Sequence, residues 1–128
     1  MKKIKIHYWS PFISKIATIK AVLNSAKSIN KYSNRSYEPT VINTFGEFSS
    51  YSLSDYKNFI TFKNLLKKNY LKYFSDKGYL RSRISWIFIF ILTFFPFLKF
   101  LKREKPDFLV IHLLTIIPLL INFFFKID

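Results

Sequence analysis

The fold is decided by residues 105–115, which read KPDFLVIHLLT. Pro106 cannot continue a helix, and it biases Lys105 towards an extended conformation. The next residues, 108–111, form a short apolar run that suits a strand buried on both faces. The stretch therefore predicts the end of one helix followed at once by a strand in the interior of a sheet.

Two polar residues, His112 and Thr115, follow this predicted strand. Beyond them, residues 116–125 are apolar again and long enough for a helix. In an open parallel sheet, ligands bind outside the carboxyl ends of the strands. His112 and Thr115 therefore stand where such a sheet places its functional groups.

The rest of the chain alternates between strand and helix patterns. A helix with apolar residues at steps of three and four begins after Ser10 or Ser14 and ends before residue 32. This alternation predicts an α/β fold, a right-handed, Rossmann-like parallel sheet with flanking helices. Further strands are expected at 3–9, 40–43 and 58–62, and further helices at 65–74 and 84–98.

Length and composition indicate one folded domain. The chain has 128 residues, and 50% of them are hydrophobic, so a packed core is expected. It contains no cysteine, which excludes disulfides. Doubly wound domains normally contain more strands than are predicted here. We therefore expect residues 1–128 to be an incomplete Rossmann-like domain, the N-terminal part of a larger protein.

The large positive charge must meet an anionic partner or be tolerated as repulsion. The chain has 21 lysine and arginine residues and 7 aspartate and glutamate residues, which gives a net charge of +14. The candidate anionic partners are nucleic acid, anionic lipid and a phosphorylated substrate. The basic residues are spread along the chain, and no zinc-finger, helix-turn-helix or RNA-binding signature is present. The expected partner is an anionic membrane surface and not nucleic acid.

Residues 84–98 form the most apolar segment, broken by Ser85, Thr93 and Pro96 and flanked by basic residues. Three interpretations stay open at this point. The segment can cross a membrane, lie on its surface between lipid phosphates, or form a buried core helix.

Several short motifs occur in order along the chain: KIHYWSPF at 5–12, GEF at 46–48, SR at 82–83, KPD at 105–107 and HLLT at 112–115. Together they resemble the N-terminal, acceptor-side domain of family 4 glycosyltransferases of the two-Rossmann (GT-B) type, in particular bacterial enzymes of surface-polysaccharide assembly. The turn after the first strand lacks the glycines that many members carry there. The family's donor-binding domain, with its paired glutamates, has no counterpart in these residues.

The resemblance implies transfer of a sugar from a nucleotide-sugar to a lipid-linked or saccharide acceptor in surface-polysaccharide biosynthesis. It implies no cofactor and no metal, with the nucleotide-sugar as donor substrate. It also implies a cytoplasmic protein, peripheral on the inner face of the bacterial cytoplasmic membrane. Without the donor-binding domain, these residues alone are expected to be inactive. The rival interpretation is a small basic membrane-associated protein without catalytic activity.

Among the candidate site residues, His112 is expected to be catalytic, because the resemblance places it in the cleft and imidazole polarises hydroxyls near neutral pH. The alternative is a histidine satisfied by neighbouring backbone. Substrate contacts are expected from five further residues: Ser10, Ser14, Glu47, Arg83 and Thr115. The alternative for Ser10, Ser14 and Thr115 is helix capping. Glu47 is alternatively a solvated acid in a loop, and Arg83 alternatively a basic flank on the membrane side.

Overall fold

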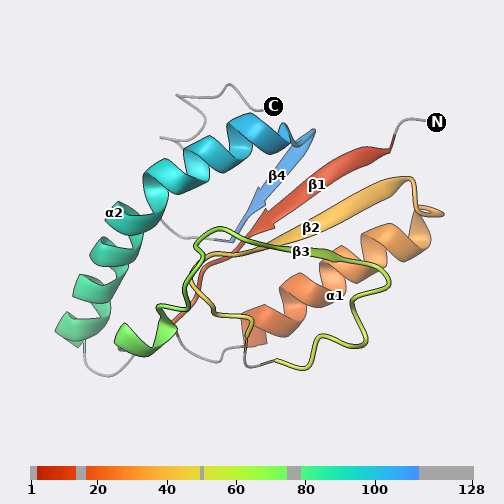
Figure 1. Cartoon of the computed structure of the whole chain (residues 1–128). Helices are drawn as coiled ribbons and strands as arrows, with labels where there is room; N and C mark the ends of the chain where they lie inside the picture. The colour runs from red at the N-terminus through yellow and green to blue at the C-terminus, as the bar shows by residue number, and fades with distance from the viewer. Residues whose placement is uncertain (1–2, 14–16, 50, 75–78, 113–128) are drawn as a thin grey trace.

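The structure, a computed structural model, describes residues 3–13, 17–49, 51–74 and 79–112. It is an α/β fold in which α1 covers one face of a four-stranded, all-parallel sheet and α2 covers the other (Figure 1). The predicted Rossmann-like architecture is confirmed. The elements are β1 (Ile4–Trp9), α1 (Ala17–Tyr32), β2 (Tyr37–Asn43), β3 (Thr61–Asn64), the 3-10 turn η1 (Leu71–Tyr73), α2 (Tyr79–Glu104) and β4 (Phe108–Ile111).

The strand order is β3-β2-β1-β4. The chain therefore proceeds outward from β1 through β2 to β3, then returns through α2 to the other side of β1. The last register pairs are Trp9 with Ile42 of β2 and Trp9 with Ile111 of β4. This reversal of direction creates a topological switch point between β1 and β4, which is where open α/β sheets bind ligands.

The face of the sheet that α1 covers forms the larger core. Side chains alternate along a strand, so the even positions of β1 point to this face and meet the apolar stripe of α1. The buried residues of this core are Ile6, Tyr8, Phe12, Ile19, Val22, Leu23, Ala26, Val41, Phe48 and Ile60.

The opposite face packs against α2 through a smaller core of Trp9, Ile42, Phe97, Phe100 and Leu101. All of the α2 residues in this core lie in its C-terminal third. The helix runs antiparallel to the strands, and Figure 1 shows its N-terminal part continuing past their carboxyl ends. We call this part of α2, residues 79–95, the overhang.

The junction between α2 and β4 differs from expectation at one residue. Lys105 has φ 46°, the left-handed region, and is not extended. Its N–H donates to the Leu101 carbonyl at 2.9 Å, so Lys105 terminates the helix in the way that αL residues commonly do. Asp107 then ties the incoming strand to β1, since its N–H donates to the Lys5 carbonyl at 3.0 Å and its carboxylate accepts the Lys5 N–H at 2.8 Å.

Two predicted elements are longer than expected: β2 begins before the expected 40–43, and α2 extends beyond the expected 84–98 at both ends. Three others differ in position, type or burial. The strand expected at 58–62 lies at Thr61–Asn64, because the preceding residues form turns. The helix expected at 65–74 is wrong: the backbone follows the end of β2 instead, with Leu65 N–H donating to the Asn43 carbonyl at 2.8 Å, and only η1 is helical. The strand at 108–111 was expected to be buried on both faces, but within the described residues it is an edge strand that pairs with β1 alone.

Candidate functional site

The switch point is bordered by two of the predicted site residues, Ser10 and His112. Each directly follows a member of the last β1–β4 register pair, Trp9 and Ile111. The His112 N–H donates to the Trp9 carbonyl at 3.1 Å, which extends the ladder by one bond and fixes the backbone there. The side chain of His112 is exposed, whereas Ser10 is buried. The parallel sheet thus brings together two residues 102 positions apart, with an imidazole accessible to a ligand at the carboxyl edge.

The turn after β1 is anchored by packing and not by a glycine-rich loop. Phe12 is buried and makes edge-to-face contacts with Phe48, at 5.1 Å between ring centroids, and Tyr51, at 6.3 Å. Aromatic pairs in this geometry stabilise by about 0.5–1.5 kcal/mol beyond their buried area. The carboxyl edge beside Ser10 is therefore a fixed surface, held by the α1-side core.

Glu47 lies in the loop that follows β2. It is fully buried, and its two carboxylate oxygens accept the N–H groups of Thr44 and Phe45, each at 2.8 Å. Burial raises the pKa of Glu47, while these backbone hydrogen bonds act in the opposite direction. In the structure the carboxylate stabilises the loop after β2 through these two hydrogen bonds. A contact between Glu47 and an acceptor hydroxyl stays a prediction.

That loop is joined to β1 through a second buried hydrogen bond. The Trp9 indole N–H donates to the Thr44 hydroxyl at 3.1 Å, and both side chains are buried. Together with Glu47, this contact holds the ends of β1 and β2 in a fixed relation. The carboxyl edge is preorganised by the same residues that form its core.

Of the remaining candidates, only Arg83 lies within the described residues. Arg83 lies in the first turns of α2, with an exposed side chain. Ser14, Thr115 and the helix expected at 116–125 lie outside the described residues. Among the described residues, no three His, Asp or Glu side chains are close enough to hold a metal ion together.

The other histidine, which its position inside the first strand predicts to be structural, is a buried polar group on the α2 side of the sheet. His7 is 2% exposed, and neither of its ring nitrogens has a hydrogen-bond partner among the described residues. Burial lowers the pKa of His7 to about 4, with a smaller contribution from the positive charge of Lys63. The only signal in the sequence was its odd position in β1, which it shares with Trp9.

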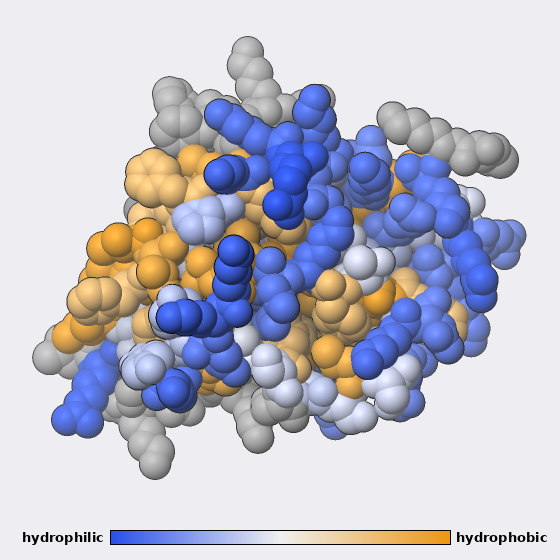
Figure 2. Space-filling model, viewed as in Figure 1, coloured by the Kyte–Doolittle hydropathy of each residue, from blue (hydrophilic) through white to orange (hydrophobic). Residues whose placement is uncertain are grey.

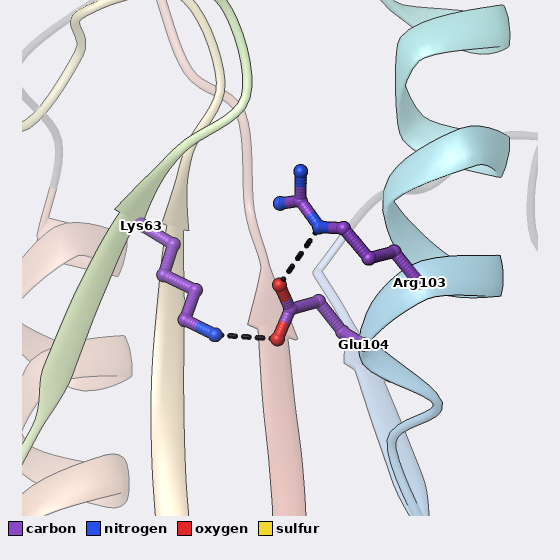
Figure 3. A network of polar contacts seen from close by, with 3 residues as sticks. All are labelled: Lys63, Arg103 and Glu104. Carbon is purple, nitrogen blue, oxygen red and sulfur yellow. Dashed lines mark hydrogen bonds and ion pairs between the residues drawn. The ribbon is translucent and has the colours of Figure 1, made fainter.

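Lys63 itself connects opposite parts of the fold. Its ammonium group, on β3, pairs with the Glu104 carboxylate at the end of α2, and Arg103 donates to the same carboxylate at 3.2 Å (Figure 3). Lys63 lowers the pKa of Glu104 through this hydrogen bond. The bridge spans the sheet above β2 and β1, and thereby holds the C-terminal end of α2 against it.

The overhang carries a row of exposed apolar side chains that recur every three or four residues, which we call the apolar stripe: Ile84, Ile87, Phe88, Ile91, Leu92 and Phe95. Figure 2 shows hydrophobic residues gathered over α2, whereas hydrophilic residues dominate the surface over the sheet and α1. A hollow of about 380 Å³ lies beside the stripe, between it and the aromatic residues Tyr73 and Phe74. Sequence periodicity did not reveal the stripe because the opposite side of the same helix is also apolar.

By length and composition, residues Arg83–Glu104 of α2 are able to cross a membrane, with a mean hydropathy of 2.1. The C-terminal part of this helix packs on the sheet, however, since Phe97, Phe100 and Leu101 are buried there. Lys99 and Lys102 are exposed on the same stretch. The apolar surface that remains free on α2 is therefore limited to the overhang.

No protein-family model, curated protein or solved structure matches this chain. The family resemblance therefore rests on the short motifs, and the Rossmann-like fold rests on the strand order.

Proposed function

We propose that this chain is the acceptor-side part of a glycosyltransferase that moves a sugar from a nucleotide-sugar to a lipid-linked or saccharide acceptor in surface-polysaccharide biosynthesis. The observation that carries the proposal is the position of His112, exposed and hydrogen-bonded through its backbone to Trp9 at the switch point. Parallel sheets of this kind bind ligands there.

In this proposal the imidazole of His112 polarises the acceptor hydroxyl or orients the sugar beside it, as imidazole does near neutral pH. Ser10 and the rigid turn that follows form the floor beside it. Donor binding belongs to a second domain, so the 128 residues alone bind acceptor without turning it over. The protein acts at the inner face of a bacterial cytoplasmic membrane, where lipid-linked acceptors are embedded.

The two histidines of the chain provide a direct test, because one is buried and the other exposed. The ring resonances of His7 and His112 are followed by NMR while a short-chain polyprenyl-diphosphate sugar is added. We expect the His112 signals to shift in a saturable manner and those of His7 to stay in place. In a His112→Ala variant, binding is followed by backbone amide resonances and should no longer be saturable, whereas Lys20→Ala, an exposed change on α1, should retain the His112 shifts.

The second candidate, a small basic membrane-associated protein without catalytic activity, is favoured by a specific observation, the exposed apolar stripe. It predicts binding to vesicles but no response of His112 to the sugar acceptor. Saturable His112 shifts with the sugar-bearing lipid and none with the same lipid diphosphate lacking the sugar would favour the enzyme. Equal shifts, or none, would reject it.

A further inference from the structure

The length of the apolar stripe limits what can cover it. From Ile84 to Phe95 the helix rises about 17 Å, at roughly 1.5 Å per residue, whereas the hydrocarbon core of a bilayer is roughly 30 Å thick. The next turns cannot extend the stripe, because Phe97 and Leu101 are buried on the sheet. The exposed apolar surface is too short to span a bilayer and has the dimensions of a surface that lies on one.

Charge is arranged around the stripe in a defined way. Arg81 precedes it by one helical turn, and Lys99 and Lys102 follow it by one and two turns on the same side of the helix. All three side chains are exposed. The only acidic residue of α2 is Glu104, which is paired with Lys63. An apolar row with cations at both ends matches a lipid layer with anionic phosphates above its acyl chains.

The same arrangement disfavours a second copy of the chain as the occupant. Two stripes packed antiparallel place Arg81 of one copy next to Lys99 and Lys102 of the other, and parallel packing places each cation next to itself. Both arrangements bring like charges together in a chain whose net charge is already +14.

Pro96 lies inside α2, between the stripe and the part of the helix that packs on the sheet. Proline removes one helical hydrogen bond and bends the helix, and Figure 1 shows α2 changing direction about half-way along its length. The overhang therefore follows a course of its own beyond the carboxyl ends of the strands. Tyr73, 70% exposed beside the hollow, adds an aromatic ring of the kind enriched at membrane interfaces.

We infer that the overhang of α2 lies in the plane of an anionic membrane, with the apolar stripe immersed among the upper acyl chains and Arg81, Lys99 and Lys102 on lipid phosphates. Because the overhang projects past the carboxyl edge of the sheet, this orientation brings His112 towards the lipid headgroups. The inference rests on the proposed function only for the membrane setting. Its test measures lipid insertion and not sugar binding, so the two can fail separately.

Immersion is tested by measuring the depth of single labelled sites in the bilayer. The chain contains no cysteine, so each introduced cysteine is the single site that a label can react with. Nitroxide labels are placed on Ile87→Cys, Ile91→Cys and Phe95→Cys, and on Lys20→Cys of α1 as the control. With vesicles of phosphatidylcholine and phosphatidylglycerol, we expect equal, shallow depths at the three stripe positions and an aqueous signal at Lys20→Cys. Depths that run through the bilayer centre would show a spanning helix, and aqueous signals at every site would show no insertion. Either result overturns the inference.

Specificity is tested with matched charge changes. Phe95→Glu is compared with Tyr32→Glu, since these side chains are 75% and 78% exposed on different helices. Lys99→Glu/Lys102→Glu is compared with Lys20→Glu/Lys31→Glu, which alters net charge by the same amount on α1. We expect the α2 changes to weaken vesicle binding by about tenfold or more and the α1 changes to have a much smaller effect.

Equal losses from both pairs would show general electrostatic attraction without docking through α2, and would overturn the inference. So would lipid-free self-association of the chain that Phe95→Glu abolishes, since the stripe would then be a contact between copies. Circular dichroism of each variant checks that the fold is kept, which is expected because every substituted side chain is exposed.

Discussion

The indole of Trp9 stacks on the ring of Phe97, with centroids 3.9 Å apart and planes inclined by 19°. This contact joins the end of β1, next to the switch point, to α2 just after the last residue of the overhang. Trp9 also donates to Thr44 at 3.1 Å. One side chain therefore links the candidate site, the sheet and the helix proposed to meet the membrane.

The burial of Phe97 predicts a large difference between two neighbouring phenylalanines. Phe97 is 0% exposed and Phe95 is 75% exposed. We expect Phe97→Ala to lower the free energy of unfolding by about 3–5 kcal/mol, because it removes the stack on Trp9 and leaves a cavity. Phe95→Ala should change it by less than about 0.5 kcal/mol. Urea unfolding of both variants in the absence of lipid measures the difference, and similar losses would mean that α2 does not pack as described.

The buried imidazole of His7 predicts a pH dependence of stability. Its pKa is about 4 in the folded protein and 6.5 in the unfolded reference, so the unfolded chain takes up the proton first as pH falls. The contribution of His7 is therefore fully present above pH 6.5 and is lost as the pH falls towards 4. The loss is on the order of 3 kcal/mol.

A His7→Phe variant keeps a ring of similar shape at this site and cannot titrate. Unfolding free energies measured between pH 4 and pH 7 should therefore fall less steeply for His7→Phe than for the unaltered chain. His112→Phe, changed at the exposed histidine, serves as the control and should retain the steeper fall. If His7→Phe and the unaltered chain show the same slope, His7 is not buried in its neutral form.

Glu47 is expected to stabilise the loop after β2. Replacing it with alanine leaves the buried N–H groups of Thr44 and Phe45 without an acceptor, at about 1–3 kcal/mol for each unpaired group. Thermal or urea unfolding of Glu47→Ala should therefore show a loss of roughly 2–5 kcal/mol. Glu38→Ala is the control, since within the described part of the chain the Glu38 carboxylate forms an exposed pair with Lys3 at 2.8 Å, and the change should cost less than about 1 kcal/mol. Equal effects of the two changes would contradict the structural role of Glu47.

Gly46 is expected to resist substitution for two separable reasons. Its φ of +107° is unfavourable for any residue with a Cβ, and a Cβ there would approach the Cγ of Asn69 to 2.3 Å. We expect Gly46→Ala to destabilise by about 1–3 kcal/mol. The double variant Gly46→Ala/Asn69→Ala should recover the part due to the clash and keep the part due to the backbone, which a double-mutant cycle separates. Full recovery would leave the backbone explanation without support.

Local sequence was sufficient wherever a pattern had a single physical solution. The amphipathic period of residues 17–32, the alternation in β1 and the apolar run of β4 are each resolved by short-range spacing, and the structure has these elements where they were expected. The stretch at 105–115 also predicted where the helix stops and where the strand starts. Lys105 was expected to be extended but adopts the αL conformation, and its N–H donates to the Leu101 carbonyl.

Tertiary structure decided the remainder, since contacts between distant residues are not visible in local patterns. The segment at 65–74 has the composition of a helix, but its backbone hydrogen bonds go to the end of β2. The burial of His7 without a hydrogen-bond partner among the described residues and the meeting of Ser10 with His112 depend on strand order. Apolar residues occur on all sides of α2 between residues 84 and 98, so hydrophobicity alone identified a helix. Only tertiary packing, including the contact of Phe97 with Trp9, determined which of its residues are buried and which are left exposed.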